Sequence, residues 1–321
     1  MTKTTSNPIL EVRGLKKYFK VPKGMLHAVD NVSFSIQRGK TLGVVGESGC
    51  GKSTTGRAVL RLLEPTAGEI TFEGIDVLKL DQEEMRKMRR KMQIIFQDPH
   101  SSLNPRMTIS DIIVEPLKLH NMCKTRAERE EKVARIMETV GLAGRLVNTY
   151  PHELDGGRRQ RVGIARALAL DPSFIVCDEP VSALDVSIQA QILNLMQDLQ
   201  DQMDLTYIFI THDLSVVNHL ADDIAVMYLG QIVEKAPVTE LFRHPQHPYT
   251  QALLSSIPVP SLKKREEAQP MKGEISSPVN PPDACRFVPR CPYTTDRCTQ
   301  TTPPLEHLGG EHYVACFLCS R

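Results

Sequence analysis

The sequence predicts an α/β fold with a parallel sheet, from two observations. Over residues 169–235, short apolar strands alternate with helical segments, the pattern of strands joined by crossover helices. Nearer the N-terminus, the apolar run Thr41–Val45 is followed directly by a glycine-rich loop and a helix-forming stretch, Thr55–Leu63. At 321 residues the chain exceeds one typical domain and can bury a large core.

The loop between these segments, Gly46–Thr54, reads G-E-S-G-C-G-K-S-T and is a complete phosphate-binding loop, or P-loop. Its three glycines let the backbone turn inward, so that successive N–H groups and the helix N-terminus face one anion. Lys52 can reach the β- and γ-phosphates of a nucleotide, and the Ser53 hydroxyl can hold a magnesium ion. A glycine-rich turn with a chance lysine is the alternative, and the strand–loop–helix context argues against it. The predicted nucleotide contacts of the loop are Gly46, Glu47, Ser48, Gly49, Cys50, Gly51, Lys52, Ser53 and Thr54.

A second half of the same site is predicted at Phe174–Glu179, F-I-V-C-D-E, an apolar strand that ends in two acids. The last residues of such a strand lie at the carboxyl edge of a parallel sheet, where ligands bind. Asp178 would hold the magnesium ion through water, and Glu179 would orient or polarise the attacking water. A solvated strand end is the alternative for this pair of acids.

Four further segments resemble the motifs of one known family. Leu154–Arg161, L-D-G-G-R-R-Q-R, is similar to the signature motif of the nucleotide-binding domains of ABC transporters. Ser182–Asp185 (S-A-L-D) is similar to their D-loop, and Thr211–Asp213 (T-H-D) to their switch histidine. Gln97, which closes the apolar strand Gln93–Phe96, matches the glutamine of their Q-loop. With the P-loop, these motifs stand in the family's order and at its spacing over residues 10–240.

The resemblance implies a sandwich of two such domains, with ATP between the P-loop of one subunit and the signature helix of the other. Backbone N–H groups at Gly156 and Gly157 would cover the γ-phosphate from the second subunit, while His212 contacts it in cis. Adenine would stack on Phe19, with Tyr18 as the alternative. Either ring could instead be part of the hydrophobic core. The resemblance also implies a magnesium ion on Ser53, Gln97 and Asp178, trans contacts to ATP from Asp155, Gly156, Gly157 and Gln160, and a D-loop formed by Ser182, Ala183, Leu184 and Asp185.

The signature departs from the family at two positions. Asp155 stands where the family has serine, and Arg158 stands where it has glutamine. A carboxylate cannot donate a hydrogen bond to the γ-phosphate, and two unit charges ~4 Å apart repel by ~4 kcal/mol at an effective dielectric of ~20. Pairing with Arg158 would offset part of this, and Asp155 can also cap a helix expected over Arg158–Leu170. We therefore expect a heterodimer with a paralogous ATPase subunit that has an intact signature.

Past residue 240, the segment Pro245–Leu254, P-Q-H-P-Y-T-Q-A-L-L, closely resembles one found in ATPase subunits of dipeptide and oligopeptide importers. The subgroup is the second of the two related ATPase subunits in such importers. Pro248 fixes the backbone, and Tyr249 can attach the following helix to the main domain. Residues Ser255–Pro282 are rich in proline, serine and charge and are predicted to be a surface tether.

The expected domain organisation follows from these motifs. We expect residues 1–240 to form the ATPase domain, with a helical subdomain over about 98–168. Residues 241–282 would hold the His-Pro-Tyr segment and the tether. Residues 283–321 would form a loop-rich cysteine extension. Within the first part, Arg126–Val140 shows apolar residues at helical spacing. The basic run Met85–Met92 is expected to form a solvated helical face.

Five of the eight cysteines lie in the last 40 residues. Disulfides are not expected in a cytosolic ATPase, and Cys285, Cys291, Cys298 and Cys316 lack the spacing of about two to four residues that is usual for ligand pairs of structural zinc. Four thiolates on loops satisfy a 4Fe–4S cluster, whose ligand spacings vary more, and the resembled importer ATPases carry one. The expectation is a 4Fe–4S cluster, with zinc and free thiols as alternatives and Cys319 as a spare. Its predicted ligands are Cys285, Cys291, Cys298 and Cys316, in the pattern C-x5-C-x6-C-x17-C.

The composition of the chain argues against a membrane span, a secretory signal and a nucleic-acid partner. No run of about 18 apolar residues exists, and the N-terminus lacks the apolar stretch of a secretory signal. A formal net charge of +1 argues against nucleic acid as the main partner. The resemblance implies a peripheral place on the cytoplasmic face of the cell membrane, two transmembrane permease subunits, and indirect action with an extracellular solute-binding protein.

Three functions are compatible with a chain that carries these motifs. The first is an ATP-hydrolysing motor for import of dipeptides or oligopeptides, in which nickel or another peptide-like solute is the alternative cargo. The second is a soluble ABC ATPase in DNA repair or translation, which usually carries coiled-coil insertions or two fused ATPase domains. The third is an exporter half with fused membrane helices. The His-Pro-Tyr segment and the cysteine tail favour the importer.

Overall fold

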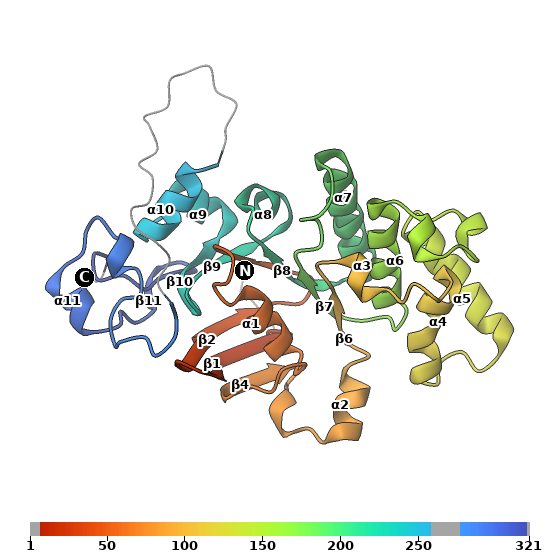
Figure 1. The fold of residues 1–321 in the computed structure, drawn as a ribbon, viewed down its shortest axis with the longest axis horizontal. Helices are drawn as coiled ribbons and strands as arrows, with labels where there is room; N and C mark the ends of the chain where they lie inside the picture. The colour runs from red at the N-terminus through yellow and green to blue at the C-terminus, as the bar shows by residue number, and fades with distance from the viewer. Residues whose placement is uncertain (1–6, 258–276, 320–321) are drawn as a thin grey trace, which may run out of the picture. The chain divides into compact units, whose positions relative to one another are not determined.

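The computed structural model describes residues 7–257 and 277–319 (Figure 1). They belong to two compact units: unit 1 comprises Met1–Gln37, Thr41–Leu78 and Phe209–Arg321, and unit 2 comprises Arg38–Lys40 and Lys79–Ile208. Both units mix strands and helices, so the predicted α/β class is confirmed. Residues 258–276 of the predicted tether lie outside the described part of the chain.

The first sheet of unit 1 is antiparallel, with strand order β2-β1-β4-β5 (Figure 1). Strands β1 and β2 are long because the polar stretch around Lys17 continues their pairing as far as Val21 and Gly24. Alternate residues such as Leu10, Val12 and Leu15 are buried, which is the period-two pattern of a half-buried strand. The bounds are β1 (Leu10–Val21), β2 (Gly24–Ile36), β4 (Ala67–Phe72) and β5 (Ile75–Asp76).

The second set of strands in unit 1 begins with β3 (Thr41–Val45), which pairs in parallel with β9 (Asp223–Tyr228). Strand β10 (Gln231–Pro237) then pairs antiparallel with β9. The hairpin of β11 (Glu306–Gly309) and β12 (His312–Val314) joins the free edge of β10. The end of the chain is therefore partly built into the sheet. The helices of this unit are α1 (Lys52–Val59), α8 (Leu214–Leu220), α9 (Val238–Arg243), α10 (Pro248–Ser255) and α11 (Asp296–Gln300).

One buried carboxylate ties the C-terminal region to this sheet. Glu234 on β10 is fully buried and accepts hydrogen bonds from the backbone N–H groups of Gln246 (2.8 Å) and His247 (2.9 Å). Its third partner is Nε2 of His312 on β12, at 2.8 Å. A buried charge is tolerated only when it is paired and hydrogen-bonded. Glu234 meets that condition by joining three segments that are distant in sequence.

Unit 2 combines the parallel pair β6 (Met92–Ile95) and β7 (Phe174–Asp178) with a set of helices. Helices α4 and α5 pack against α6, as Figure 1 shows. Strand β8 (Thr206–Thr211) runs from unit 2 into unit 1. The helices are α2 (Gln82–Met88), α3 (Pro99–Ser102), α4 (Ile109–Leu119), α5 (Arg126–Thr139), α6 (Gly156–Leu168) and α7 (Val186–Met203).

The two helix predictions in this unit have different outcomes. Helix α5 spans Arg126–Thr139 with Val140 as its C-cap, and the predicted apolar positions of Arg126–Val140 are buried. The prediction of one solvated helical face over Met85–Met92 was wrong in part. Helix α2 ends at Met88, strand β6 begins at Met92, and the two methionines of the helix are buried because they stand three residues apart on its inner side.

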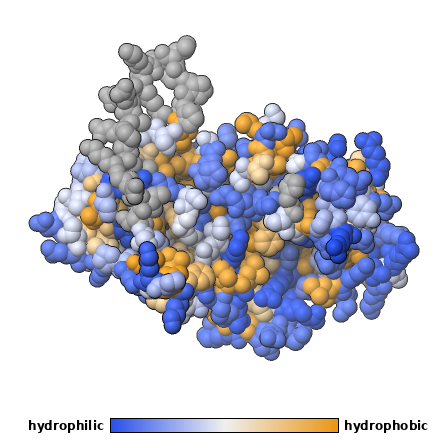
Figure 2. All heavy atoms as spheres, in the orientation of Figure 1, coloured by the Kyte–Doolittle hydropathy of each residue, from blue (hydrophilic) through white to orange (hydrophobic). Residues whose placement is uncertain are grey.

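Within the described residues, none of the helices combines the length and apolar character needed to cross a bilayer. The face drawn in Figure 2 is mostly hydrophilic, with separate apolar patches among the charged and polar residues.

The N-terminus of helix α10 depends on a buried histidine. His247 is the N-cap residue, and its Nδ1 accepts a hydrogen bond from the backbone N–H of Tyr249 at 3.0 Å. The side chain is 1 % exposed, and this burial lowers the pKa of His247 to about 4. The histidine is therefore neutral at pH 7, and the cap requires the unprotonated ring.

This cap makes folding sensitive to mild acid. The unfolded chain takes up a proton at His247 near pH 6.5, whereas the folded chain resists protonation down to about pH 4. Stability is therefore complete above pH 6.5 and is lost as the pH falls, by about 2–3 kcal/mol at pH 4.5. Urea unfolding across pH 7.5–4.5 measures this loss. The variant His247→Asn keeps a capping acceptor that does not titrate, so it should lose less stability over this range; parallel curves for the two proteins would contradict the assignment.

Candidate functional site

The P-loop follows strand β3 and leads into helix α1. Gly46 and Gly51 have φ values of 149° and 102°, a region that favours glycine. A Cβ atom would lie 2.2 Å from the carbonyl oxygen of Met227 at Gly46, and 2.1 Å from that of Ala28 at Gly51. The helix begins at Lys52 and ends at Val59, so it starts earlier and is shorter than Thr55–Leu63. Its N-cap, Gly51, offers no side-chain acceptor, and the first-turn N–H groups face the loop.

Lys52 lies against the backbone of the loop. Its side chain is buried, with 4 % of the residue exposed. The ammonium donates to the carbonyl oxygens of Gly46 (2.8 Å) and Glu47 (2.9 Å). A positive charge held inside a loop of backbone N–H groups is an arrangement suited to a phosphate.

In unit 2, the two acids stand at the end of β7 as predicted. Asp178 is the last residue of the strand and is 1 % exposed. Glu179 follows with φ of 48°, a left-handed conformation that is costly for a residue with a Cβ and that clusters at functional sites. Its carboxylate accepts a hydrogen bond from Nε2 of Gln97 at 2.9 Å. The structure thus brings the Q-loop glutamine and the proposed hydrolytic acid together.

The signature glycines pack against the D-loop segment. A Cβ atom at Gly157 would lie 2.7 Å from Cγ2 of Ile188, and one at Gly156 would lie 3.2 Å from Cδ2 of Leu184. Glycine is therefore needed for this close approach as well as for any N–H contact. Gln160 is 1 % exposed, and its Nε2 has no hydrogen-bond partner among the described residues. The other D-loop residues lie just before α7, and Asp185 is the N-cap of that helix. The Ser182 hydroxyl donates to the Glu179 carbonyl oxygen at 3.1 Å, and Ala183 is exposed.

Asp155 caps the signature helix. Its Oδ1 accepts from the backbone N–H of Arg158 at 2.7 Å, and the Arg158 guanidinium lies 3.5 Å from its Oδ2. Both the expected cap and the expected ion pair are present. The helix starts at Gly156, two residues before the predicted start, because the cap precedes both glycines.

The remaining predicted residues lie in unit 1. His212 is exposed and follows β8 directly. The Tyr18 ring stacks on His27 with centroids 3.9 Å apart, and its hydroxyl donates to Asp30 at 2.5 Å. Phe19 is partly exposed, with the Lys17 ammonium 4.9 Å from its ring centroid. The ring and the hydroxyl of Tyr18 both already contact other side chains, so Phe19 remains the residue that we predict to stack on adenine.

The predicted site residues therefore divide between the two units. Unit 1 holds the P-loop, Phe19 and His212. Unit 2 holds the Q-loop glutamine, the acids at the end of β7, the signature and the D-loop.

The sequence did not predict two contacts to the P-loop from the C-terminal region. Tyr249 is fully buried as expected, but its hydroxyl also accepts the backbone N–H of Glu47 at 2.9 Å. Arg290 donates two hydrogen bonds to the Glu47 carboxylate, at 2.7 and 3.0 Å. These partners are 202 and 243 residues from Glu47, and no local pattern links residues that far apart. The tyrosine of the His-Pro-Tyr segment was the one available signal.

The prediction of an iron–sulfur site, a 4Fe–4S cluster on Cys285, Cys291, Cys298 and Cys316, was wrong. Across residues 7–257 and 277–319, no group of three or more His, Cys, Asp or Glu side chains is placed to hold a metal ion. Burial raises the pKa of the Cys285 thiol to about 11 and also raises that of Cys316, which favours the protonated form of both thiols. None of the eight cysteines, Cys319 included, forms a disulfide.

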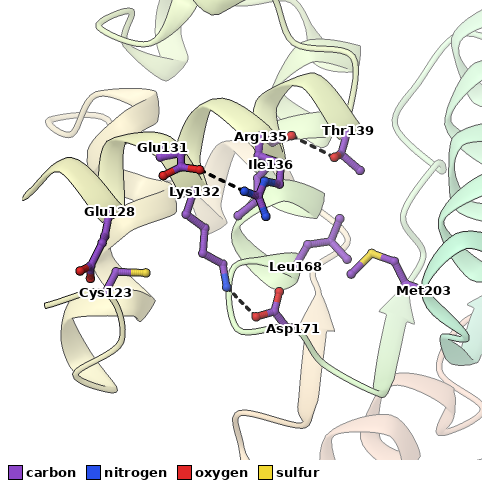
Figure 3. A pocket seen from close by; sticks show the side chains of 10 residues that line it. All are labelled: Cys123, Glu128, Glu131, Lys132, Arg135, Ile136, Thr139, Leu168, Asp171 and Met203. Carbon is purple, nitrogen blue, oxygen red and sulfur yellow. Dashed lines mark hydrogen bonds and ion pairs between the residues drawn. The ribbon is translucent and has the colours of Figure 1, made fainter. Parts of the chain in front are cut away.

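A pocket of about 360 Å³ lies elsewhere in unit 2 (Figure 3). Lys132 reaches Asp171 across it at 2.5 Å, and Arg135 pairs with Glu131 on the same helix. None of its lining residues belongs to the motifs above. This pocket is therefore separate from the predicted nucleotide site.

Two family descriptions match the chain. Residues 29–182 match the ABC transporter family, and residues 233–298 match the oligopeptide/dipeptide transporter C-terminal region. The oligopeptide transport ATP-binding protein AppF of Bacillus subtilis is 51 % identical, with 100 % of both chains covered. The dipeptide transport ATP-binding protein DppF of Haemophilus influenzae is 50 % identical, with 97 % of both chains covered.

Solved structures agree with these matches. An ATP-binding cassette, solved as a dimer in a post-hydrolysis state bound to ADP and Pi, has a TM-score of 0.66 and 30 % sequence identity. The match covers 71 % of this chain and 98 % of the cassette. The likeness therefore extends over nearly all of that cassette and leaves about three tenths of this chain beyond it.

The cap on α6 can be tested apart from any nucleotide. Asp155→Ala removes the acceptor for the Arg158 N–H and should lower the free energy of unfolding by about 1 kcal/mol. Asp155→Ser keeps a capping oxygen and should stay within about 0.5 kcal/mol of wild type, because the exposed ion pair with Arg158 contributes little. Chemical denaturation of the three proteins measures the difference. Equal loss in both variants would show that the carboxylate charge, and not the cap, supplies the stability.

Proposed function

The chain belongs to the ATP-binding proteins of ABC transporters, in the group that carries the oligopeptide/dipeptide transporter C-terminal region, and from this premise we propose that it is the ATP-hydrolysing motor subunit of a peptide importer. The observation that carries the proposal is the contact between the two defining regions. The tyrosine of the C-terminal region bonds directly to the P-loop at Glu47. The part of the chain typical of peptide importers is thus built onto the nucleotide site.

In this proposal the P-loop binds the phosphates of ATP. Backbone N–H groups and the Lys52 ammonium neutralise phosphate charge, which is most of what phosphoryl transfer asks of a protein. Magnesium would be held by Ser53, Gln97 and Asp178, since hydroxyl, amide and carboxylate oxygens are the donors this cation prefers. When bound, it would offset part of the phosphate charge.

Glu179 orients the water that attacks the γ-phosphate. Its carboxylate accepts a hydrogen bond from the water, the new P–O bond forms, and the bond to the ADP oxygen breaks. The hydrogen bond from Gln97 holds one oxygen of this carboxylate at 2.9 Å, which fixes its direction. His212 contacts the γ-phosphate, and Phe19 stacks on the adenine.

We further infer that the ATPase acts in a dimer on a membrane. The exposed end of the signature motif and Val186, 81 % exposed beside the D-loop, suit a face that a second ATPase subunit covers. The proposed partners are a paralogous ATPase, two transmembrane permease subunits and, indirectly, an extracellular solute-binding protein, with no role for nucleic acid. The chain would act at the cytoplasmic face of the cell membrane. Residues 1–240 form the ATPase domain in this proposal, with a helical subdomain near 98–168.

The catalytic assignment is tested by two substitutions. Glu179→Gln should retain ATP but lower turnover by a factor of about 10²–10³, because it removes the group that orients the water. Lys52→Ala should lose ATP binding, since the phosphate charge is no longer neutralised. Steady-state ATPase rates and bound nucleotide measure the two effects, and His212→Ala should likewise trap ATP. Turnover within about twofold of wild type in Glu179→Gln would overturn the role of that residue.

The signature predicts two unequal ATP sites. In a heterodimer, this chain's P-loop meets the paralogue's signature, while Asp155 faces the paralogue's nucleotide. The Asp155 carboxylate accepts a hydrogen bond from the Arg158 N–H and pairs with its guanidinium; being an acceptor only, it offers no donor to a γ-phosphate. Asp155→Ser supplies a hydroxyl there.

We expect Asp155→Ser to raise, or at least not lower, ATP occupancy at the paralogue's site in the assembled transporter. The reason is removal of a like-charge repulsion of ~4 kcal/mol at ~4 Å and an effective dielectric of ~20. Nucleotide occupancy per transporter and peptide uptake are the measurements. Loss of transport in this variant, or full-rate hydrolysis by a homodimer of the isolated chain, would contradict the asymmetry.

A further inference from the structure

We infer that the C-terminal region positions the P-loop through Glu47, and that Arg290 and Tyr249 are positioning residues that set the affinity of this chain for MgATP. The inference rests on the proposed function, because it takes the P-loop to be the MgATP site. It adds that residues outside the ATPase motifs control how ready that site is for nucleotide.

Glu47 is held at all three of its polar groups. Its backbone N–H donates to the Tyr249 hydroxyl at 2.9 Å. Its carboxylate accepts the two bonds from Arg290, at 2.7 and 3.0 Å. Its carbonyl oxygen accepts from the Lys52 ammonium at 2.9 Å and from the Cys50 N–H at 3.3 Å. The N–H and the carboxylate are therefore held by the C-terminal region, and the carbonyl by the loop itself.

The Arg290–Glu47 pair has a geometry that fixes direction as well as distance. Two parallel N–H···O bonds from one guanidinium form a planar fork, which specifies the orientation of the carboxylate. The Arg290 side chain is 7 % exposed and the Glu47 side chain 22 % exposed, so water screens the pair only weakly. The guanidinium also lies over the Tyr228 ring, 5.9 Å from its centroid.

Both positioning residues stand on a rigid base. Phe287, next to the short turn that carries Arg290, packs between Tyr228 and Tyr249, with ring centroids 5.3 and 5.5 Å away. All three rings are buried. Aromatic contacts of this kind restrict the rotation of each ring. The side chains of Tyr249 and Arg290 therefore have few other orientations available in which they would not contact Glu47.

The rest of the loop needs such a support. Gly46 and Gly49, on either side of Glu47 and Ser48, have φ values of 149° and 79° and are flexible by nature. A Cβ at Gly49 would meet nothing within 4 Å, so this part of the loop is open. Ordering a flexible loop on binding costs affinity, and holding it beforehand removes that cost. Fixing the Glu47 peptide therefore favours the conformation that presents N–H groups to phosphate.

The chain offers a matched control for each residue. Arg286 also comes from the C-terminal region and makes a buried ion pair, but with Asp30 on strand β2, not with the P-loop. Tyr207 is also buried, but its hydroxyl donates to the carbonyl oxygen of Met196 at 3.2 Å and not to the P-loop. Arg286→Ala and Tyr207→Phe therefore repeat the chemical change without touching Glu47.

The test uses the full-length chain for MgATP binding and the assembled transporter for steady-state ATPase rates. Arg290→Ala and Tyr249→Phe should each raise the Kd and KM for MgATP about tenfold, since each loses one specific hydrogen-bonded anchor. Their kcat should change by about twofold or less, because binding and not the chemical step is affected. Arg290→Lys keeps the charge without the fork and should fall between wild type and Arg290→Ala. The two control variants should bind MgATP within about twofold of wild type.

A double variant decides whether Arg290 acts through Glu47. In a Glu47→Gln background the ion pair is already lost, so Arg290→Ala should add about twofold or less to the KM. Independent, multiplying effects would overturn the inference. It would equally fall if Arg290→Ala and Arg286→Ala changed the KM alike, because both would then act only by anchoring the tail. If Arg290→Ala does not fold, Tyr249→Phe against Tyr207→Phe gives the same decision. Wild-type chain that fails to bind MgATP would refute the proposed function instead.

Discussion

The backbone of the P-loop is the constraint around which unit 1 is organised. At Gly46 and Gly51 the loop has no room for a side chain, because neighbouring segments fill the space beside it. Carbonyl oxygens of Ala28 on β2 and Met227 on β9 come so close that only glycine fits at Gly51 and Gly46. The Gly230 N–H bonds to the Cys50 carbonyl oxygen at 2.8 Å. Both sheets of this unit therefore take part in shaping one loop.

The C-terminal region continues this pattern. It completes the sheet edge at β10, satisfies a buried carboxylate at Glu234, and packs Phe287 against two tyrosines of the ATPase core and the His-Pro-Tyr segment. Each contact buries a polar or aromatic group whose exposure or lack of a partner would cost free energy. Because Phe287 packs on Tyr249, whose hydroxyl accepts the Glu47 N–H, this packing of the tail and the order of the P-loop depend on a shared contact.

Unit 2 shows how one residue can serve local structure and limit chemistry at once. Asp155 completes helix α6 through its cap, a role that serine fills equally well. What the carboxylate adds is a partner for Arg158 and a negative charge at the exposed end of the signature. Glu179 has the opposite character, since its left-handed backbone is costly locally and its side chain is held by Gln97.

By itself the sequence determined the features that depend on neighbours a few residues apart. The P-loop between β3 and α1, the acids at the end of β7, the apolar face of α5 and the cap at Asp155 all follow from local spacing, because strand and helix periods act over short stretches. Only the tertiary structure decided the partners of Glu47, the pairing of β12 with β10, and the fate of the tail cysteines, whose spacing suited a cluster that their arrangement does not form. The partners of Glu47 lie 202 and 243 residues away, and His312 of β12 lies 78 residues from Glu234 of β10. No local pattern links residues that far apart, and none encodes the burial of the tail cysteines.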